Sequence, residues 1–437
     1  MKPAIERSGS RIVPLLMAKR IAASRLGRLS SAFSPRARRL LVALCVVAIA
    51  AAAAGVVGFA SPEGFVSTPG RVPALGVLTV AACFALWGPG LLIASALDGR
   101  HGALAPAITV IAAAGVGWLL FWAWFWSPQV GMVAASVVLA GTFAGLALRP
   151  SAMLGSGIAR PFGTAILVSL MYVFLAGARG GLAEGPTQIA HRYWVSADNS
   201  IPLIFADVLT TGRGDLRPFL IGDWQSSDRP PLETGLILSS IGFVPGDLRP
   251  IVYIALGVAA NAVWVLALWS VLRTLRVPES RIVPVVLAVA VTGAVFVNTV
   301  YAWPKLLAGS LVLAAAAILL ARGLPPLGAG LGVGVALALA MLAHGGAAAG
   351  VIGICVVAGP ALREWGRRGG LAFIGAAVAT YLPWVLYQRL FDPPGDRLPK
   401  WHLAGAVDVT EMAVVQAIID GYAADGLVGA LAQVLNE

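Results

Sequence analysis

The feature that most constrains this chain is the recurrence of long apolar stretches separated by short polar segments. Hydrophobic residues make up 59% of the chain and charged residues only 12%, whereas about a quarter of the residues in a soluble globular protein are charged. A stretch of about 20 apolar residues crosses a bilayer, and its backbone must be helical because lipid offers no hydrogen-bond partners. The sequence therefore predicts an all-α, polytopic transmembrane helical bundle.

About eleven apolar stretches approach the length of a span. They cover residues 40–60, 74–97, 104–126, 130–148, 161–179, 250–272, 282–300, 305–321, 327–343, 347–361 and 371–390. A further apolar segment, residues 232–245, is too short to cross, and we expect a helix that lies at the outer face or dips into it.

The distribution of basic residues predicts the orientation. The segment before Leu40 carries ten Lys or Arg residues and one Glu, so the N-terminus should stay in the cytoplasm of a plasma (inner) membrane protein. With this topology the inner segments hold twenty basic and four acidic residues, and the outer segments hold eleven and sixteen. The net charge of +11 then follows from membrane topology, and we predict no nucleic-acid partner.

Four parts follow from this pattern. They are a basic, disordered cytoplasmic tail (1–39), an N-terminal transmembrane bundle (40–160), a transmembrane core (161–390) with an outer loop (180–249), and an extracytoplasmic C-terminal segment (391–437). The last segment is expected to form two short amphipathic helices broken between Gly421 and Gly426.

One polar stretch, residues 179–247, holds eight of the twenty carboxylates. Within it, Asp198 precedes the amphipathic pattern of residues 201–209, which predicts a helix lying flat on the membrane. Further on, Asp228-Arg229-Pro230-Pro231 leads into the short apolar segment, and the two prolines stiffen the backbone there. Any chemistry of this protein is therefore expected in this outer loop.

Three features of this loop together resemble the GT-C membrane glycosyltransferases. They are an acidic residue that opens a large outer loop, an amphipathic helix that ends in a glycine turn, and a basic-Pro-Pro-Leu run. The pattern is most similar to the polyprenyl-phosphate-sugar-dependent branch, which includes protein mannosyltransferases and the aminoarabinose transferase of lipid A. The resemblance spans roughly residues 160–405. It implies inverting transfer of a sugar from a polyprenyl-phosphate donor to an envelope glycan, lipid or protein acceptor at the outer membrane face.

The resemblance also implies roles for two residues. Asp198 matches the loop carboxylate that acts as general base or orients the acceptor, and Arg229 matches the basic residue that contacts the lipid phosphate. A carboxylate can accept the acceptor's proton, and a guanidinium binds phosphate through two parallel hydrogen bonds. The chain departs from the family in having Asn199 where many relatives carry a second acid, and in the five spans that precede the loop.

Further substrate-binding candidates come from other outer segments. Lys305 and His344 lie at predicted outer helix ends, Asp228 neighbours Arg229, and the loop after Phe391 offers two cations and an aromatic ring for a phosphorylated sugar. These loop candidates are Arg397, Lys400 and Trp401.

Each candidate has a simpler explanation. Asp198 could cap a helix that starts near Ser200, and Asp228 could cap a loop or form an ion pair. Arg229 and Lys305 could be interfacial anchors, His344 could make a structural hydrogen bond, and Trp401 could anchor an interfacial loop. No metal-ligand set is evident, although a divalent ion is not ruled out by the residues present.

Two other functions stay open. A transporter or flippase of a lipid-linked molecule would carry ionisable groups inside its spans, and the predicted spans are nearly free of them. A noncatalytic scaffold, or a subunit that works with another membrane protein, would not depend on Asp198.

Overall fold

The computed structural model of the protein describes residues 35–59, 71–97, 102–154, 157–177, 185–193, 195–212, 225–321, 323–404 and 412–436. Throughout these residues the chain is helical, and they contain no β-strand. The predicted all-α class is therefore confirmed. Residues 1–34 of the basic tail, together with Asp215 and Asp223 of the outer loop, lie outside the described residues.

The helices follow one another along the chain with short connections. They are α2 (Pro35–Phe59), α4 (Arg71–Leu97), α5 (Ala105–Trp126), α6 (Pro128–Leu148), α7 (Ser151–Leu154), α8 (Ala159–Gly177), α9 (Gly185–Arg192), η1 (Ala197–Ser200), α10 (Ile201–Thr211), η2 (Ser226–Asp228), α11 (Leu232–Ile237), η3 (Ile241–Phe243), α12 (Arg249–Ala262), α13 (Trp264–Thr274), α14 (Glu279–Ala290), α15 (Gly293–Val300), α16 (Lys305–Leu320), α17 (Pro326–Ala343), α18 (Ala347–Leu390), α19 (Arg397–Ala404) and α20 (Val414–Asn436).

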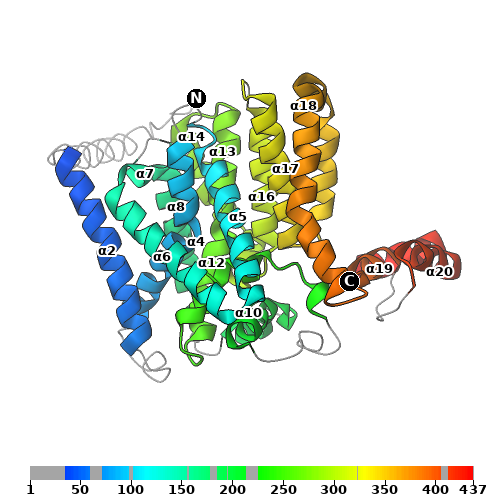
Figure 1. Ribbon diagram of the computed structural model, residues 1–437, viewed down its shortest axis with the longest axis horizontal. Helices are drawn as coiled ribbons and strands as arrows, with labels where there is room; N and C mark the ends of the chain where they lie inside the picture. Colours follow the sequence, from blue (N-terminus) through cyan, green and yellow to red (C-terminus); the bar gives the residue numbers. More distant parts are fainter. Residues whose placement is uncertain are drawn as a thin grey trace, which may run out of the picture.

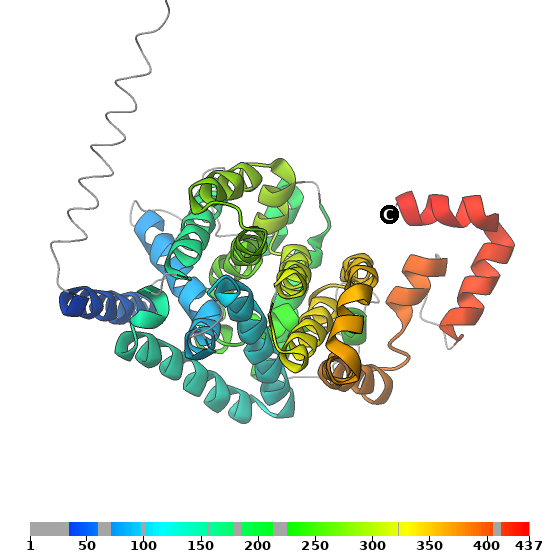
Figure 2. The same cartoon turned by 90° about the horizontal axis from the view of Figure 1, so that it is seen from above.

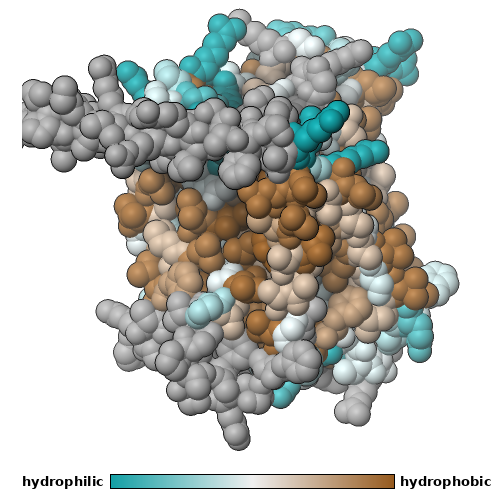
Figure 3. Space-filling view, turned by 90° about the vertical axis from the view of Figure 1, so that its left-hand side faces the viewer, coloured by the Kyte–Doolittle hydropathy of each residue, from teal (hydrophilic) through white to brown (hydrophobic). Residues whose placement is uncertain are grey.

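Most of the predicted apolar stretches coincide with one helix or with a part of one, whereas 250–272 and 282–300 each cover two successive helices. Among the described residues, seven helices are long and apolar enough to cross a membrane, or eight when α14 and α15, bent by 71°, count as one broken span. Figure 3 shows hydrophobic side chains across the middle of one face and hydrophilic ones above and below them. This distribution is typical of a multi-pass membrane protein, because only the ends of the spans meet water.

The centre of the bundle is the nearly continuous helix formed by α12 and α13, almost all of whose residues are buried. The early helices pack directly against it, with α4 on α12 and α5 on α13 (Figure 1). As a result, helices from the N-terminal third and from the later part of the chain share one apolar core.

The short apolar segment 232–245 enters this core. Its helix α11 is fully buried, and a Cβ atom on Gly235 would lie 2.3 Å from the backbone oxygen of Gly117 in α5. Only two glycines permit so close an approach of the two backbones. The segment thus dips into the bundle, and α10 packs against α11 through buried residues such as Phe205 and Leu209.

The last long helix, α18, is a hairpin of two helical arms. Gly366 interrupts it with φ 62°, a left-handed conformation that glycine adopts without a steric penalty. Gly369 in the second arm meets Gly330 of α17, where a Cβ on Gly330 would lie 2.3 Å from the Gly369 oxygen. The second arm leads into α19 and α20, which extend to one side of the bundle (Figure 2). As predicted, the C-terminal helix is interrupted, at Gly426.

Candidate functional site

Asp198 lies in η1, the single turn that leads directly into α10. The N-cap positions of η1 and α10 are occupied by Ser196 and Ser200, so Asp198 is not the residue that caps this helix. Its carboxylate oxygen Oδ1 lies 3.6 Å from Nη2 of Arg229, and 37% of the side chain is exposed. The structure therefore places together the two residues for which the family resemblance implies roles.

Arg229 follows η2 and is largely buried. Its guanidinium carbon lies 5.5 Å from the ring centroid of Trp303, in a cation–π contact. Burial lowers the pKa of Arg229, and the neighbouring Asp198 carboxylate partly opposes this shift. A buried cation of this kind interacts strongly with an anion because water screens it poorly.

The turn between α15 and α16 supplies the next part of the site. Tyr301 donates a hydrogen bond to the backbone oxygen of Ser196 at 2.5 Å, which ties this turn to the segment before Asp198. Ala302 has φ 54°, a strained conformation for a residue with a side chain. Its Cβ faces Gly257 of α12, and a Cβ added to Gly257 would lie only 2.6 Å from it. The turn is thus held against the central helix and presents Trp303 to Arg229.

Lys305 and His344 complete the cluster. The Trp303 and His344 rings meet edge to face at 5.9 Å, and His344 Nδ1 accepts a hydrogen bond from the backbone N–H of Gly346 at 2.9 Å. Lys305 is the first residue of α16 and is exposed. Four of the candidates therefore lie around Trp303 at one end of the bundle, although they are up to 146 residues apart in the sequence. They are Asp198, Arg229, Lys305 and His344.

An apolar groove of about 570 Å³ begins at Lys305 and His344. It runs between the first turns of α16, including Val312 and Leu313, and the start of α18, including Gly350. Its cationic and imidazole groups thus stand at one end of an otherwise apolar surface. This combination suits an amphiphile with an anionic headgroup and a hydrocarbon chain.

The other candidates form a separate buried group. Nη1 of Arg397 lies 3.6 Å from Oδ2 of Asp228, and Nζ of Lys400 lies 2.7 Å from Oδ1 of Asp396. Burial raises the pKa of Asp228 to about 6, an effect that its hydrogen bond from the Gln225 backbone N–H and the nearby Arg397 partly offset. Both expected alternatives for Asp228, loop capping and ion pairing, are observed. Phosphate binding by Arg397 and Lys400 stays a prediction, as does the role of Trp401, whose side chain lies outside the described residues.

Sequence reasoning missed Glu233 as a candidate. Its side chain is buried inside the bundle on α11, and neither carboxylate oxygen has a hydrogen-bond partner. Burial raises the pKa of Glu233 well above its usual value of 4.5, because it disfavours the charged form. The available signal was an acidic residue inside an otherwise apolar run, directly after Pro230, Pro231 and Leu232.

In the described ranges, no three His, Cys, Asp or Glu side chains gather in an arrangement suited to a metal ion. Comparison of the chain with family models, with curated proteins and with solved structures finds no match. The fold thus defines an all-helical protein of the multi-pass membrane type, and its function must be argued from the cluster at one end of the bundle.

Proposed function

We propose that this protein is an integral membrane glycosyltransferase of the GT-C type, which transfers a sugar from a polyprenyl-phosphate donor to an envelope glycan, lipid or protein acceptor. The observation that carries the proposal is the cluster around Trp303. A half-exposed carboxylate, Asp198, faces a buried guanidinium, Arg229, and the adjacent Lys305 and His344 head an apolar groove. In this proposal the polyprenyl chain lies in the groove and its phosphate meets the cations.

The proposed chemistry is one inverting displacement. Asp198 takes the proton of the acceptor hydroxyl as its oxygen attacks the anomeric carbon of the sugar. The bond between that carbon and the phosphate oxygen breaks, and its electron pair leaves with the polyprenyl phosphate. Arg229 and Lys305 stabilise the charge that develops on this leaving group.

The proposed topology has eleven crossings: α2, α4, α5, α6, α8, the α12–α13 pair, the α14–α15 pair, α16, α17 and the two arms of α18. One end of the bundle gathers the connections near Ala103, Gly157 and Arg273, since Ser270 donates to the Ala103 oxygen and Arg273 donates to the Gly157 oxygen. This end carries an excess of basic residues, so we assign it to the cytoplasm. The cluster around Trp303 lies at the opposite end, on the outer face of the plasma membrane.

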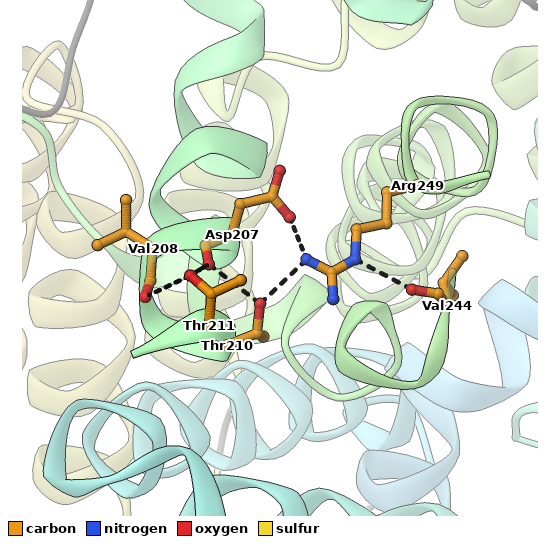
Figure 4. A network of polar contacts seen from close by, with 6 residues as sticks. All are labelled: Asp207, Val208, Thr210, Thr211, Val244 and Arg249. Carbon is orange, nitrogen blue, oxygen red and sulfur yellow. Dashed lines mark hydrogen bonds and ion pairs between the residues drawn. The ribbon is translucent and has the colours of Figure 1, made fainter. Parts of the chain in front are cut away.

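The test is transfer of radiolabelled sugar from a panel of polyprenyl-phosphate sugars in proteoliposomes, comparing the wild type with Asp198→Asn. We expect turnover to fall by about 10²- to 10⁴-fold, the usual contribution of a general base, while donor binding persists. A matched control is Asp207→Asn. Asp207 is a similarly exposed carboxylate, 43% exposed against 37%, but it pairs with Arg249 at the other end of α10 (Figure 4).

Equal turnover in the wild type and Asp198→Asn would remove Asp198 as the base. An equal loss in Asp198→Asn and Asp207→Asn would indicate general damage to the outer loop. If folded wild-type protein transfers sugar from no donor in the panel, the glycosyltransferase proposal fails.

Transport of a lipid-linked molecule is the second candidate, and one observation favours it. Glu233 is a buried carboxyl group without hydrogen-bond partners inside the bundle, and such groups in membrane proteins often belong to proton or substrate pathways. The cluster around Trp303 favours headgroup chemistry, because its ionisable groups lie at the end of the bundle.

A further inference from the structure

A buried polar clasp joins the outer loop to the C-terminal part of the chain. We define the clasp as Ser226, Ser227 and Asp228 on one side and Tyr387, Gln388, Asp392 and Arg397 on the other. The two sides are 161 to 169 residues apart in the sequence, and hydrogen bonds and an ion pair join them.

Asp392 and Gln388 fix the backbone of the outer loop. Oδ2 of Asp392 accepts hydrogen bonds from the Ser227 backbone N–H at 2.8 Å and from the Ser226 hydroxyl at 2.5 Å. Gln388 in turn donates to the Ser227 oxygen at 3.0 Å. These bonds set the position of the two residues that precede Asp228-Arg229.

The ion pair of Asp228 with Arg397 is almost completely buried. The exposed fractions are 1% for Asp228 and 2% for Arg397. Burying both charges carries a desolvation cost, so such a pair is a poor source of stability compared with apolar residues of similar size. A role in fixing one arrangement of the loop accounts better for its presence.

That arrangement matters because Asp228 is bonded directly to Arg229 in the chain. An unpaired Asp228 carboxylate would attract the neighbouring guanidinium and compete with Asp198 or with a bound phosphate. Arg397 supplies a positive charge to Asp228 at 3.6 Å. Arg229 is then directed toward Asp198, also at 3.6 Å, and toward Trp303.

We infer that the clasp supports the substrate site, and that Arg397 is a positioning residue which, through Asp228, orients Arg229 for the donor phosphate. The choice of a phosphate as the ligand rests on the proposed function. The contact between the outer loop and the C-terminal part of the chain does not depend on the proposed function.

Two measurements on the full chain in nanodiscs test the loop contact and the phosphate ligand separately. Hydrogen exchange of the peptide that covers residues 225–232 reports the order of the loop, and titration with farnesyl phosphate reports the affinity for a polyprenyl phosphate. The variants are Arg397→Lys, which keeps the charge but loses the planar fork, and the double variant Asp228→Asn with Arg397→Gln, which leaves no uncompensated buried charge. Arg389→Met is the matched control, because Arg389 lies in the same segment but is 56% exposed and pairs with Asp396 outside the clasp.

We expect faster exchange of residues 225–232 and about tenfold weaker farnesyl phosphate binding in both clasp variants, with thermal stability close to that of the wild type. Arg389→Met should match the wild type in both measurements. Replacing farnesyl phosphate with inorganic phosphate should reduce binding in every protein, since the groove contributes the rest of the affinity.

The inference is overturned if both folded clasp variants exchange and bind as the wild type does, because the ion pair would then be structural only. If the wild type does not bind farnesyl phosphate but loop exchange still rises in the clasp variants, the clasp orders the loop and the proposed phosphate ligand is wrong.

Discussion

The loose pairing of Asp198 with Arg229 matters most at the scale of single residues. Hydrogen bonds between a guanidinium and a carboxylate are usually about 2.7–2.9 Å long, whereas these two groups are 3.6 Å apart. The longer separation fits the role proposed for the Asp198 carboxylate, which is to accept the proton of an acceptor hydroxyl.

Protonation of Asp228 should weaken donor binding in mildly acidic solution. Its pKa is raised from 3.8 to about 6, mainly by burial, so below pH 6 it loses the charge that pairs with Arg397. The groups that face it are Arg397, Arg229, Asp392 and the Gln225 N–H. We expect the affinity for farnesyl phosphate to fall as the pH drops through 6, and we expect Asp228→Asn to lack this step.

Titration of Asp228 does not itself destabilise the fold in this pH range. Between pH 3.8 and about 6 the folded protein binds more protons at Asp228 than the unfolded chain does, so this group raises the free energy of unfolding as the pH falls. Titration of farnesyl phosphate itself affects the wild type and Asp228→Asn equally, so the difference between their pH profiles reports Asp228. An identical pH profile in both proteins would contradict the prediction.

Replacement of Glu233 by Gln should be tolerated. Burial raises the pKa of this carboxyl group well above 4.5 and so favours the protonated acid, which a neutral amide matches closely in shape. The acid contributes stability below pH 4.5 that is lost as the pH rises toward its raised, folded-state pKa. Glu233→Gln should remove this loss, which thermal unfolding at several pH values would detect. A large fall in the melting temperature at neutral pH would instead indicate an ionised, ligand-binding Glu233.

At the scale of elements, the close contact of α11 with α5 positions the site. The loop that carries Arg229 leads directly into α11, whose residues Leu232, Leu236 and Ile237 are all buried in the core. A displacement of α11 would therefore move Arg229 relative to Asp198, although neither residue belongs to the contact.

Gly235→Ala should disrupt both stability and donor binding. The new methyl group would lie 2.3 Å from the Gly117 oxygen, a backbone atom that cannot rotate away, and overpacking of this kind costs about 1–3 kcal/mol. Gly375→Ala in α18 is the control, because nothing lies within 4 Å of the added methyl group and Ala favours the helix by about 0.5–1 kcal/mol. Thermal unfolding and farnesyl phosphate titration test both, and wild-type behaviour of Gly235→Ala would show that α11 does not control the site.

At the scale of the whole molecule, the two ends of the bundle differ in chemistry. One end carries the basic turn at Gly366, with Arg363, Arg367 and Arg368 around it. The other carries the cluster around Trp303, the clasp and the C-terminal helices. The positive-inside rule assigns the first end to the cytoplasm.

Cysteine labelling tests this orientation. In a chain whose own Cys45, Cys83 and Cys355 are replaced, a membrane-impermeant maleimide should label Met412→Cys in intact cells, because Met412 is exposed at the end that carries the site. Arg367→Cys should react only after the membrane is permeabilised. The opposite pattern would place the candidate site in the cytoplasm and remove the outer-face reaction.

The sequence alone determined the helical membrane class, the positions of the helices and the break near Gly426, because apolar length and glycine conformation act locally along the chain. The family resemblance also singled out Asp198 and Arg229, each for its own role. Tertiary structure decided the rest. Only the packing of α11 inside the bundle buries Glu233, only the turn at Ala302 brings Trp303 between Arg229 and His344, and only the return of the α18 hairpin brings Arg397 to Asp228. These are contacts between segments far apart in the chain, and whether a charge is exposed or paired depends on what the fold places next to it.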